Sequence, residues 1–178
     1  MKLRRATPDD AAAIARVHID SWRAAYRGLV PGSCLQKLDH GGRAQRLRES
    51  LAEGKEEIYV AEQAREVIGF AALGPCRDPG VGKKATGEIR AIYVDPRHWR
   101  KGAGTVLCRH AEGTLRARGC VQVVLWVFEV NEGARRFYEA MGFRTDGSSK
   151  MLDPGAPLKA VRYRKALGGG DPLGEPTE

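Results

Sequence analysis

Several features of secreted, membrane or metal-dependent proteins are missing from this sequence of 178 residues. No apolar run approaches the ~20 residues needed to cross a bilayer, and the first residues lack the apolar segment of a signal peptide. The four cysteines include no Cys-x-x-Cys pair, which predicts reduced thiols rather than a disulfide or zinc framework. The four histidines are isolated from one another. We therefore expect a cytoplasmic protein without membrane attachment and without a metal site.

Negative charge is in short supply, since 22 acidic residues face 30 lysines and arginines, for a formal net charge of +8. A basic surface is typical of nucleic-acid-binding proteins. However, the arginines are scattered along the chain, and no basic block alternates with aromatic residues. A small polyanionic ligand would also favour a basic site. Charge alone leaves both interpretations open, and it is the motifs below that lead us to expect no nucleic-acid partner.

Strand and helix patterns alternate in the second half of the chain, which predicts an α/β fold around a mixed central sheet with helices on both faces. The expected strands are Lys2–Ala6, Ile58–Glu62, Val67–Leu73, Glu88–Val94, Val121–Phe128, Phe143–Thr145 and Ala160–Lys165. The expected helices are Pro8–Tyr26, Gly42–Ala52, Gly102–Arg118 and one capped by Asn131 that ends at Met141, with a turn at Pro31–Ser33. We expect a single domain over residues 1–166, followed by a disordered tail of glycine, proline and acidic residues at 167–178.

The segment Tyr93–Thr105 combines a strand end, a basic turn and glycines that open a helix. Gly102 and Gly104 allow a ligand to approach the backbone, and the first N–H groups of a helix attract anions. Arg100 and Lys101 add positive charge beside these groups. The spacing matches neither the Rossmann fingerprint nor the P-loop. On its own, the segment also fits an ordinary tight turn between a strand and a helix.

A second motif covers Asn131–Phe143. On a helix, Ala134, Phe137, Tyr138 and Met141 fall on one face, because they are spaced at i, i+3, i+4 and i+7. A stripe of this kind is, by itself, typical of a hydrophobic core.

Taken together, the two motifs resemble the GNAT superfamily of N-acetyltransferases over Glu88–Phe143. That family carries hydrophobic-Tyr-Val-x-Pro, then Gln or Arg, two spacers, Gly, one spacer and Gly or Ala. It also carries Asn-x-x-Ala-x-x-Phe-Tyr-x-x-x-Gly-Phe, which this chain matches in full. The first pattern departs at one position, where Trp99 replaces the usual Gln or Arg. Arg100 and Lys101 are then the candidates to supply charge at a phosphate.

The resemblance implies acetyl-CoA as cosubstrate and a sheet that splays between its fourth and fifth strands. Pantetheine would enter that gap and pair with strand backbone, while the pyrophosphate would lie on the helix start. The residues implied to bind acetyl-CoA are Ile92, Tyr93, Val94, Arg100, Lys101, Gly102, Ala103, Gly104, Thr105, Asn131 and Ala134.

Acetyl transfer to an amine requires a base, because presenting a primary amine in neutral form at pH 7 costs about 4.6 kcal/mol. The resemblance makes Glu88 the candidate base, with a solvated strand-edge carboxylate as the alternative. It makes Tyr138 the acid that protonates the departing thiolate, with a buried tyrosine bonded to backbone as the alternative. A backbone N–H near Ile92 would polarise the thioester oxygen. We expect direct transfer in a ternary complex.

The acceptor is the part of the reaction that the sequence specifies least. The resemblance implies a primary amine of a small molecule or a peptide. In this family the first helix walls the acceptor site, so Trp22 and Tyr26 are candidate substrate contacts, with core packing as the alternative. A domain that senses acyl-CoA without turnover is the second hypothesis. Homodimers are common in the family, and the sequence does not decide the oligomeric state.

Overall fold

The computed structural model describes residues 1–79, 81 and 85–168 and has a seven-stranded mixed sheet at its centre. The strand order is β1-β2-β3-β4-β5-β7-β6, and β4–β5 is the parallel pair while the other neighbours are antiparallel. The strands are β1 (Lys2–Arg5), β2 (Glu57–Gln63), β3 (Glu66–Pro75), β4 (Thr86–Val94), β5 (Gln122–Phe128), β6 (Arg144–Leu152) and β7 (Leu158–Ala166). The helices are α1 (Ala11–Ala25), α2 (Gly32–Gln36), α3 (His40–Ala52), α4 (Ala103–Ala117) and α5 (Glu132–Ala140).

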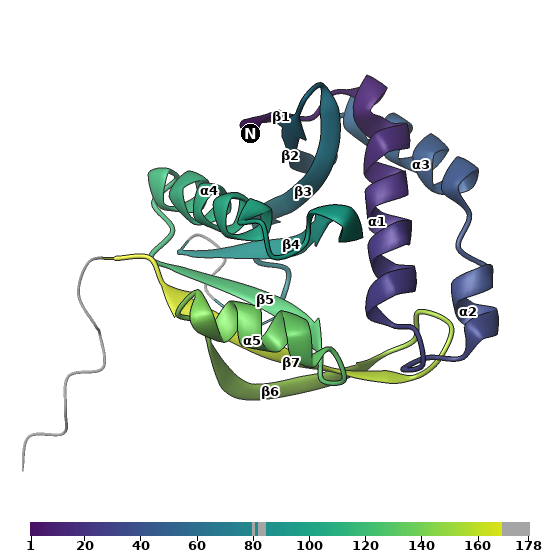
Figure 1. The fold of residues 1–178 in the computed structure, drawn as a ribbon. Helices are drawn as coiled ribbons and strands as arrows, with labels where there is room; N and C mark the ends of the chain where they lie inside the picture. The colour runs from purple at the N-terminus through teal and green to yellow at the C-terminus, as the bar shows by residue number, and fades with distance from the viewer. Residues whose placement is uncertain (80, 82–84, 169–178) are drawn as a thin grey trace, which may run out of the picture.

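Helices cover both faces of the sheet, which confirms the predicted α/β class (Figure 1). On one face, Leu115 of α4 and Tyr138 of α5 share a core cluster with Leu125 of β5. On the other face, Ile14 of α1 packs in a cluster with Phe70 of β3. The side of the sheet that α4 and α5 cover is called the α4 face below, and the side that α1 covers is called the α1 face.

The sheet opens between β4 and β5. These strands pair only where Thr86–Ile89 lies beside Gln122–Leu125. Directly after this segment β4 carries a bulge, because Ala72 lies opposite Ala91 whereas Leu73 lies opposite Ile89. A bulge bends its strand and increases the local twist, so it accounts for the departure of β4 from β5. The predicted splay is therefore confirmed, and it begins at Arg90.

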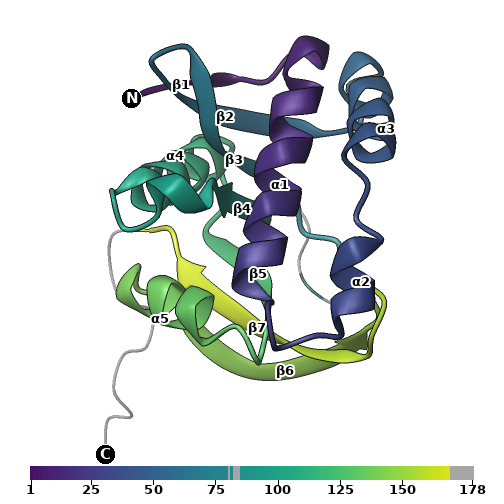
Figure 2. The same cartoon turned by 45° about the vertical axis from the view of Figure 1, so that its right-hand side comes forward.

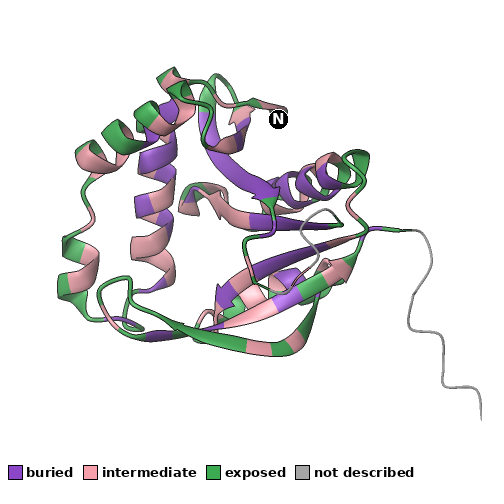
Figure 3. Cartoon of the chain, turned by 180° about the vertical axis from the view of Figure 1, so that it is seen from behind, coloured by how far each residue is buried: buried purple, intermediate pink, exposed green. Residues whose placement is uncertain are grey.

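The secondary structure predicted for two short segments was wrong. The last-but-one strand was expected over Phe143–Thr145, but β6 extends to Leu152 along the edge of the sheet, where most of its residues are exposed (Figure 3). The turn expected at Pro31–Ser33 is instead the start of α2. Figure 2 shows the turn between β6 and β7 next to α2, where Cys34 Sγ lies 2.9 Å from the carbonyl oxygen of Gly155.

The chain stays packed as far as the end of β7 and one residue beyond. Leu167 is buried, and its N–H donates to the carbonyl of Val121 over 2.8 Å. Residue 167 was therefore wrongly assigned to the disordered tail, and residues 169–178 of that predicted tail lie outside the described part of the chain. In the described ranges, no helix has both the length and the apolar character to cross a membrane.

Candidate active site

The start of α4 presents backbone donors to solvent. Gly102 caps the helix in the left-handed region, at φ +86°, which favours glycine. No side chain caps this end, and in the described part of the chain the N–H groups of Ala103, Gly104 and Thr105 have no backbone acceptor. A Cβ added to Gly102 would meet no atom within 4 Å, so the approach is open. With the helix dipole behind them, these donors suit an anion.

The basic turn before α4 contributes one uncommitted cation. Trp99 turns back, so that its indole N–H donates to the carbonyl of Val94 over 2.6 Å. Lys101 Nζ donates to the carbonyl of Arg97 over 2.9 Å. Arg100 is exposed and makes no side-chain hydrogen bond or ion pair among the described residues. Of the two cations predicted to replace the usual basic residue at Trp99, Arg100 is therefore the freer to bind phosphate.

The gap between the parted strands is a cavity of about 90 Å³. It brings together predicted site residues from the end of α1, from β4 and from the start and body of α5. These residues are Tyr26, Ile92, Tyr93, Asn131, Ala134 and Tyr138. Its remaining lining residues are Ile89, Arg90, Ala91, Trp126, Val127 and Phe128.

The pairing of β4 with β3 decides which backbone groups face this gap. The N–H of Asp95 donates to the carbonyl of Ile68 across β3 over 2.8 Å. Because backbone groups alternate along an antiparallel strand, those of Ile92 and Val94 face the gap and those of Tyr93 face β3. Tyr93 therefore borders the cavity only through its side chain, whereas Ile92 and Val94 offer an unpaired strand edge.

Tyr138 has the environment of a proton donor. Its side chain lies on α5 and is only 8% exposed. Tyr138 borders the cavity, and its hydroxyl makes no hydrogen bond among the residues that the structure describes. Burial raises the pKa of Tyr138 above its ordinary value, so the phenol stays protonated at neutral pH. The alternative of a tyrosine bonded to backbone does not hold in this structure.

Asn131 joins two elements at the mouth of the gap. Its Oδ1 accepts from the N–H of Ala134 over 3.0 Å and so caps α5, as predicted. Its Nδ2 donates to the hydroxyl of Tyr26 over 3.0 Å, which ties the end of α1 to the start of α5. Burial raises the pKa of Tyr26.

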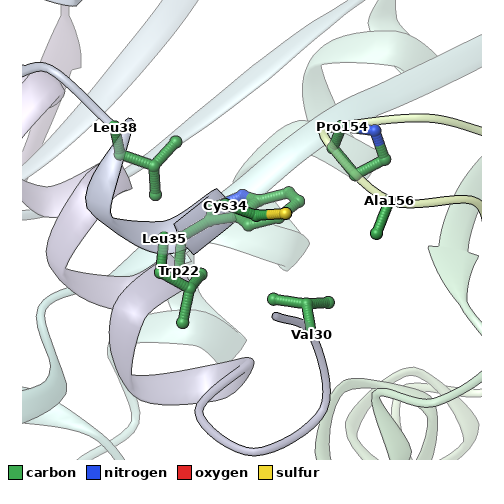
Figure 4. A pocket seen from close by; sticks show the side chains of 7 residues that line it. All are labelled: Trp22, Val30, Cys34, Leu35, Leu38, Pro154 and Ala156. Carbon is green, nitrogen blue, oxygen red and sulfur yellow. The ribbon is translucent and has the colours of Figure 1, made fainter. Parts of the chain in front are cut away.

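Trp22 does not line the gap, although it packs against Tyr26, which does, with ring centroids 4.4 Å apart. Its indole N–H donates to the Tyr93 hydroxyl over 2.9 Å, and burial raises the pKa of that hydroxyl to about 12. Trp22 also lines a small apolar cavity of about 10 Å³. Figure 4 shows this cavity between α2 residues such as Cys34 and the turn that carries Pro154 and Ala156. Of the two candidate substrate contacts, Tyr26 borders the gap and Trp22 does not.

Glu88 is buried beneath an arginine. Its side chain is 4% exposed, and Arg77 from the segment after β3 covers it. Glu88 Oε1 accepts from Arg77 Nη2 over 2.7 Å, and Oε2 accepts from Nε over 3.0 Å and from the backbone N–H over 3.1 Å. Glu88 does not border the cavity, although the next residue, Ile89, does. The alternative of a solvated strand-edge carboxylate does not fit this burial.

Several residues around the gap were not predicted from the sequence. Trp126 of β5 borders it and donates its indole N–H to Asp78 over 3.0 Å. Arg90 also borders it, as the extra residue of the β4 bulge at the point where the strands part. The bulge has no sequence signal here, so this place of Arg90 was not predicted.

No group of three or more His, Cys, Asp or Glu side chains that could hold a metal ion occurs within the described ranges. All four cysteines have free thiols. Burial, followed by the nearby Glu112 carboxylate, raises the pKa of Cys108 to about 12. This thiol is therefore a poor nucleophile at neutral pH.

Comparisons with known proteins agree with this geometry. The profile of the Acetyltransferase (GNAT) family matches residues 19–143. An uncharacterised N-acetyltransferase of Bacillus subtilis, YuaI, is 32% identical over 160 residues, which cover 89% of each chain.

Solved structures share the fold. The PaiA N-acetyltransferase of Thermoplasma acidophilum, in complex with coenzyme A, superposes with a TM-score of 0.74 at 18% identity, over 93% of this chain and 99% of that one. YncA of Salmonella typhimurium, solved with its cofactor acetyl-CoA, gives a TM-score of 0.69 at 22% identity, over 96% of each chain. Because the family profile matches well over half of the sequence, this chain belongs to the GNAT family of acetyltransferases.

Proposed function

We propose that this protein moves an acetyl group from acetyl-CoA to a primary amine of a small molecule or peptide, by direct transfer in a ternary complex. The observation that carries the proposal is an uncapped helix start beside a parted pair of strands, with the free Tyr138 hydroxyl between them. The family membership and the N-acetyltransferase relative in Bacillus subtilis support it.

The residues present fit the cosubstrate. The pyrophosphate would accept from the N–H groups of Ala103, Gly104 and Thr105, with Arg100 adding charge. The pantetheine arm carries amides, which would pair with the unpaired edge at Ile92 and Val94 as an added strand does. The carbonyl of Val94 already accepts from Ser21 Oγ over 2.7 Å and from Trp99, so the N–H of Val94 and the groups of Ile92 are the free ones.

In the proposed reaction, the neutral amine nitrogen bonds to the thioester carbon and the carbon–sulfur bond breaks. The backbone N–H of Ile92 would stabilise negative charge on the carbonyl oxygen. Tyr138 would pass its proton to the leaving thiolate, and its buried phenol is protonated for that purpose. The amine proton would leave toward Glu88.

The base step needs an intermediary. Glu88 lies beside the gap rather than on it, and Arg77 occupies both of its carboxylate oxygens. We therefore infer that the proton reaches Glu88 through water, or after Arg77 has turned away. Arg77 is able to turn, because its side chain is 63% exposed and sits in the segment that leads from β3.

The test is thiol release from acetyl-CoA in the presence of a panel of amines. Tyr138→Phe should lower kcat by about a hundredfold, because acid catalysis contributes that much or more, while the affinity for coenzyme A stays unchanged. Tyr59→Phe is the matched control, since Tyr59 bonds Glu57 far from the gap, and it should keep the wild-type rate.

An unchanged kcat in Tyr138→Phe would remove the acid role. Tight binding of acetyl-CoA without acetylation of any amine, including protein N-termini and lysines, would favour a sensor of acyl-CoA over an enzyme.

A further inference from the structure

Arg90 is a cation in the wall of the gap that has no counterion among the described residues. We propose that the amine acceptor carries an anionic group, a carboxylate or a phosphate, and that Arg90 binds it. This inference rests on the proposed acetyl transfer and specifies the substrate class of the same site.

Strand alternation and the bulge of β4 together place the Arg90 side chain. A Cβ at Gly87 would collide with Leu115 of α4, and Ile89 packs in the same cluster as Leu115, so these residues face α4. Glu88 and Arg90 alternate with them and face α1. After the bulge, Ala91 also packs in the α1 cluster. Arg90 and Ala91 are thus neighbours on the α1 face, at the point where the strands part.

Gly74 makes room for the guanidinium. A Cβ added to Gly74 would lie 2.6 Å from Arg90 Nη2 and 2.9 Å from its Cζ, closer than real Cβ contacts allow. The guanidinium therefore lies against the backbone of β3 at Gly74, in space that a Cβ would fill. From this position the side chain borders the gap.

The charges around Arg90 are otherwise paired. Asp78 forms an ion pair with Arg162 at 3.0 Å and also accepts a hydrogen bond from the Trp126 indole. Asp146 forms an ion pair with Arg162 at 2.7 Å. Glu88 forms an ion pair with Arg77.

Arg90 itself has little to bind. It makes one long hydrogen bond, 3.4 Å from Nη2 to the carbonyl of Pro75, and no ion pair in the described part of the chain. Its Nε is buried without an acceptor among those residues. A guanidinium has five donors, so most of its hydrogen-bonding capacity is available to a ligand.

The α1 face is the side from which the acceptor would approach. The proposed pyrophosphate site lies at the start of α4, on the opposite face of the sheet. Arg90 is therefore separated from the phosphates of acetyl-CoA by the sheet itself. It is two residues from Ile92, about 6 to 7 Å along the strand. An acceptor whose amine meets the thioester near Ile92 would place an anionic group a few bonds away beside Arg90.

The experiment measures kcat/KM for matched amines that differ in one anionic group. The pairs are α-amino acids against their amides, and phosphoethanolamine against ethanolamine, which separates a carboxylate from a phosphate. A charge-assisted bond to the arginine predicts a preference of about ten- to a hundredfold for the anionic member of at least one pair.

Variants test whether Arg90 is responsible. Arg90→Gln should bring the preference close to one, mainly through KM, and Arg90→Lys should retain part of it. Gly74→Ala should weaken the preference without removing the charge, because its Cβ displaces the guanidinium. Arg48→Gln is the control, since Arg48 is exposed on α3 far from the gap, and it should keep the wild-type preference.

Equal use of both members of every pair, or a preference that survives in Arg90→Gln, would overturn the inference. If no amine is acetylated, calorimetry of the same pairs with protein saturated in coenzyme A separates the two claims. Selective binding of the anionic member, lost in Arg90→Gln, would support the anion site while the proposed acetyl transfer fails. Equal or absent binding would overturn the anion site as well.

Discussion

At the scale of single residues, Tyr138 and Glu88 are both buried but differ in what they bind. The Tyr138 hydroxyl has no partner among the described residues, whereas both Glu88 oxygens accept from Arg77. In the proposed reaction, Tyr138 meets its acceptor only when the thiolate forms, so it needs no partner beforehand. The Glu88 carboxylate needs one, because a buried charge without a counterion is costly.

Substitution of Glu88 tests the base role. Glu88→Gln should lower kcat/KM at pH 7, because the amine then has to lose its proton without help. The loss should shrink as the pH approaches the pKa of the amine itself, near 10.4 for an alkylamine, where neutral amine is already abundant. A pH–rate profile of both proteins measures this. A constant ratio of rates from pH 7 to 10 would contradict the assignment.

Some residues of the site could be predicted from the sequence and others could not. Asn131 and Tyr138 could be found, because the motif that contains them is local and helical. The partner of Glu88 could not, since Arg77 meets it across the β3–β4 hairpin and arginines are scattered along the chain. The position of Arg90 at the gap could not be predicted either, because the bulge that contains it leaves no signal in the local sequence.

At the scale of elements, the start of α4 depends on the left-handed conformation of Gly102. Gly102→Ala should destabilise the fold by about 1–2 kcal/mol, because a Cβ disfavours positive φ. It should also weaken the binding of coenzyme A, since the N–H groups would shift. Chemical denaturation and calorimetry measure the two effects.

Gly113 on the same helix provides the matched control for Gly102→Ala. It is exposed and helical, and a Cβ there would meet no atom within 4 Å. Gly113→Ala should therefore stabilise the protein by about 0.5–1 kcal/mol and leave coenzyme A affinity unchanged. Equal behaviour of the two variants would contradict the special role of residue 102.

Elements with strong hydrophobic periodicity were predicted well and polar ones were not. α1, α4 and β5 each bury an apolar face or run, and their predicted bounds lie close to the observed ones. β6 was mostly missed, because its residues are polar, mostly exposed and interrupted by Gly147 at φ +83°. Its strand conformation comes from pairing with β7 at the edge of the sheet, which is a tertiary effect.

At the scale of the whole molecule, a half-buried histidine on α1 and a buried aspartate just after β4 tie stability to pH. Burial, followed by the charge of Arg43, lowers the pKa of His18 to about 4. Asp95, just after β4, accepts from Arg97 and Arg16, which holds its pKa well below its usual range. Both groups have a lower pKa in the folded state than in the unfolded chain. They therefore contribute stability at neutral pH that is lost in acid.

The two groups act in different pH windows. The His18 contribution is complete above about pH 6.5 and is lost as the pH falls through about 4, at a cost of about 3 kcal/mol. The Asp95 contribution is lost only below about pH 4. In His18→Gln, the fall in the free energy of unfolding between pH 7 and 4.5 should be smaller than in the wild type. Urea titrations at both pH values measure it, and an equal fall in the two proteins would refute the prediction.

The central claim is that the start of α4 and the parted strands together form a site for acetyl-CoA. Calorimetric titration of the full-length protein with acetyl-CoA tests it most directly. We expect saturable one-to-one binding that Gly102→Ala weakens and Gly113→Ala preserves. A titration without heat of binding up to millimolar acetyl-CoA, at more than one temperature, would show that this site does not bind acetyl-CoA.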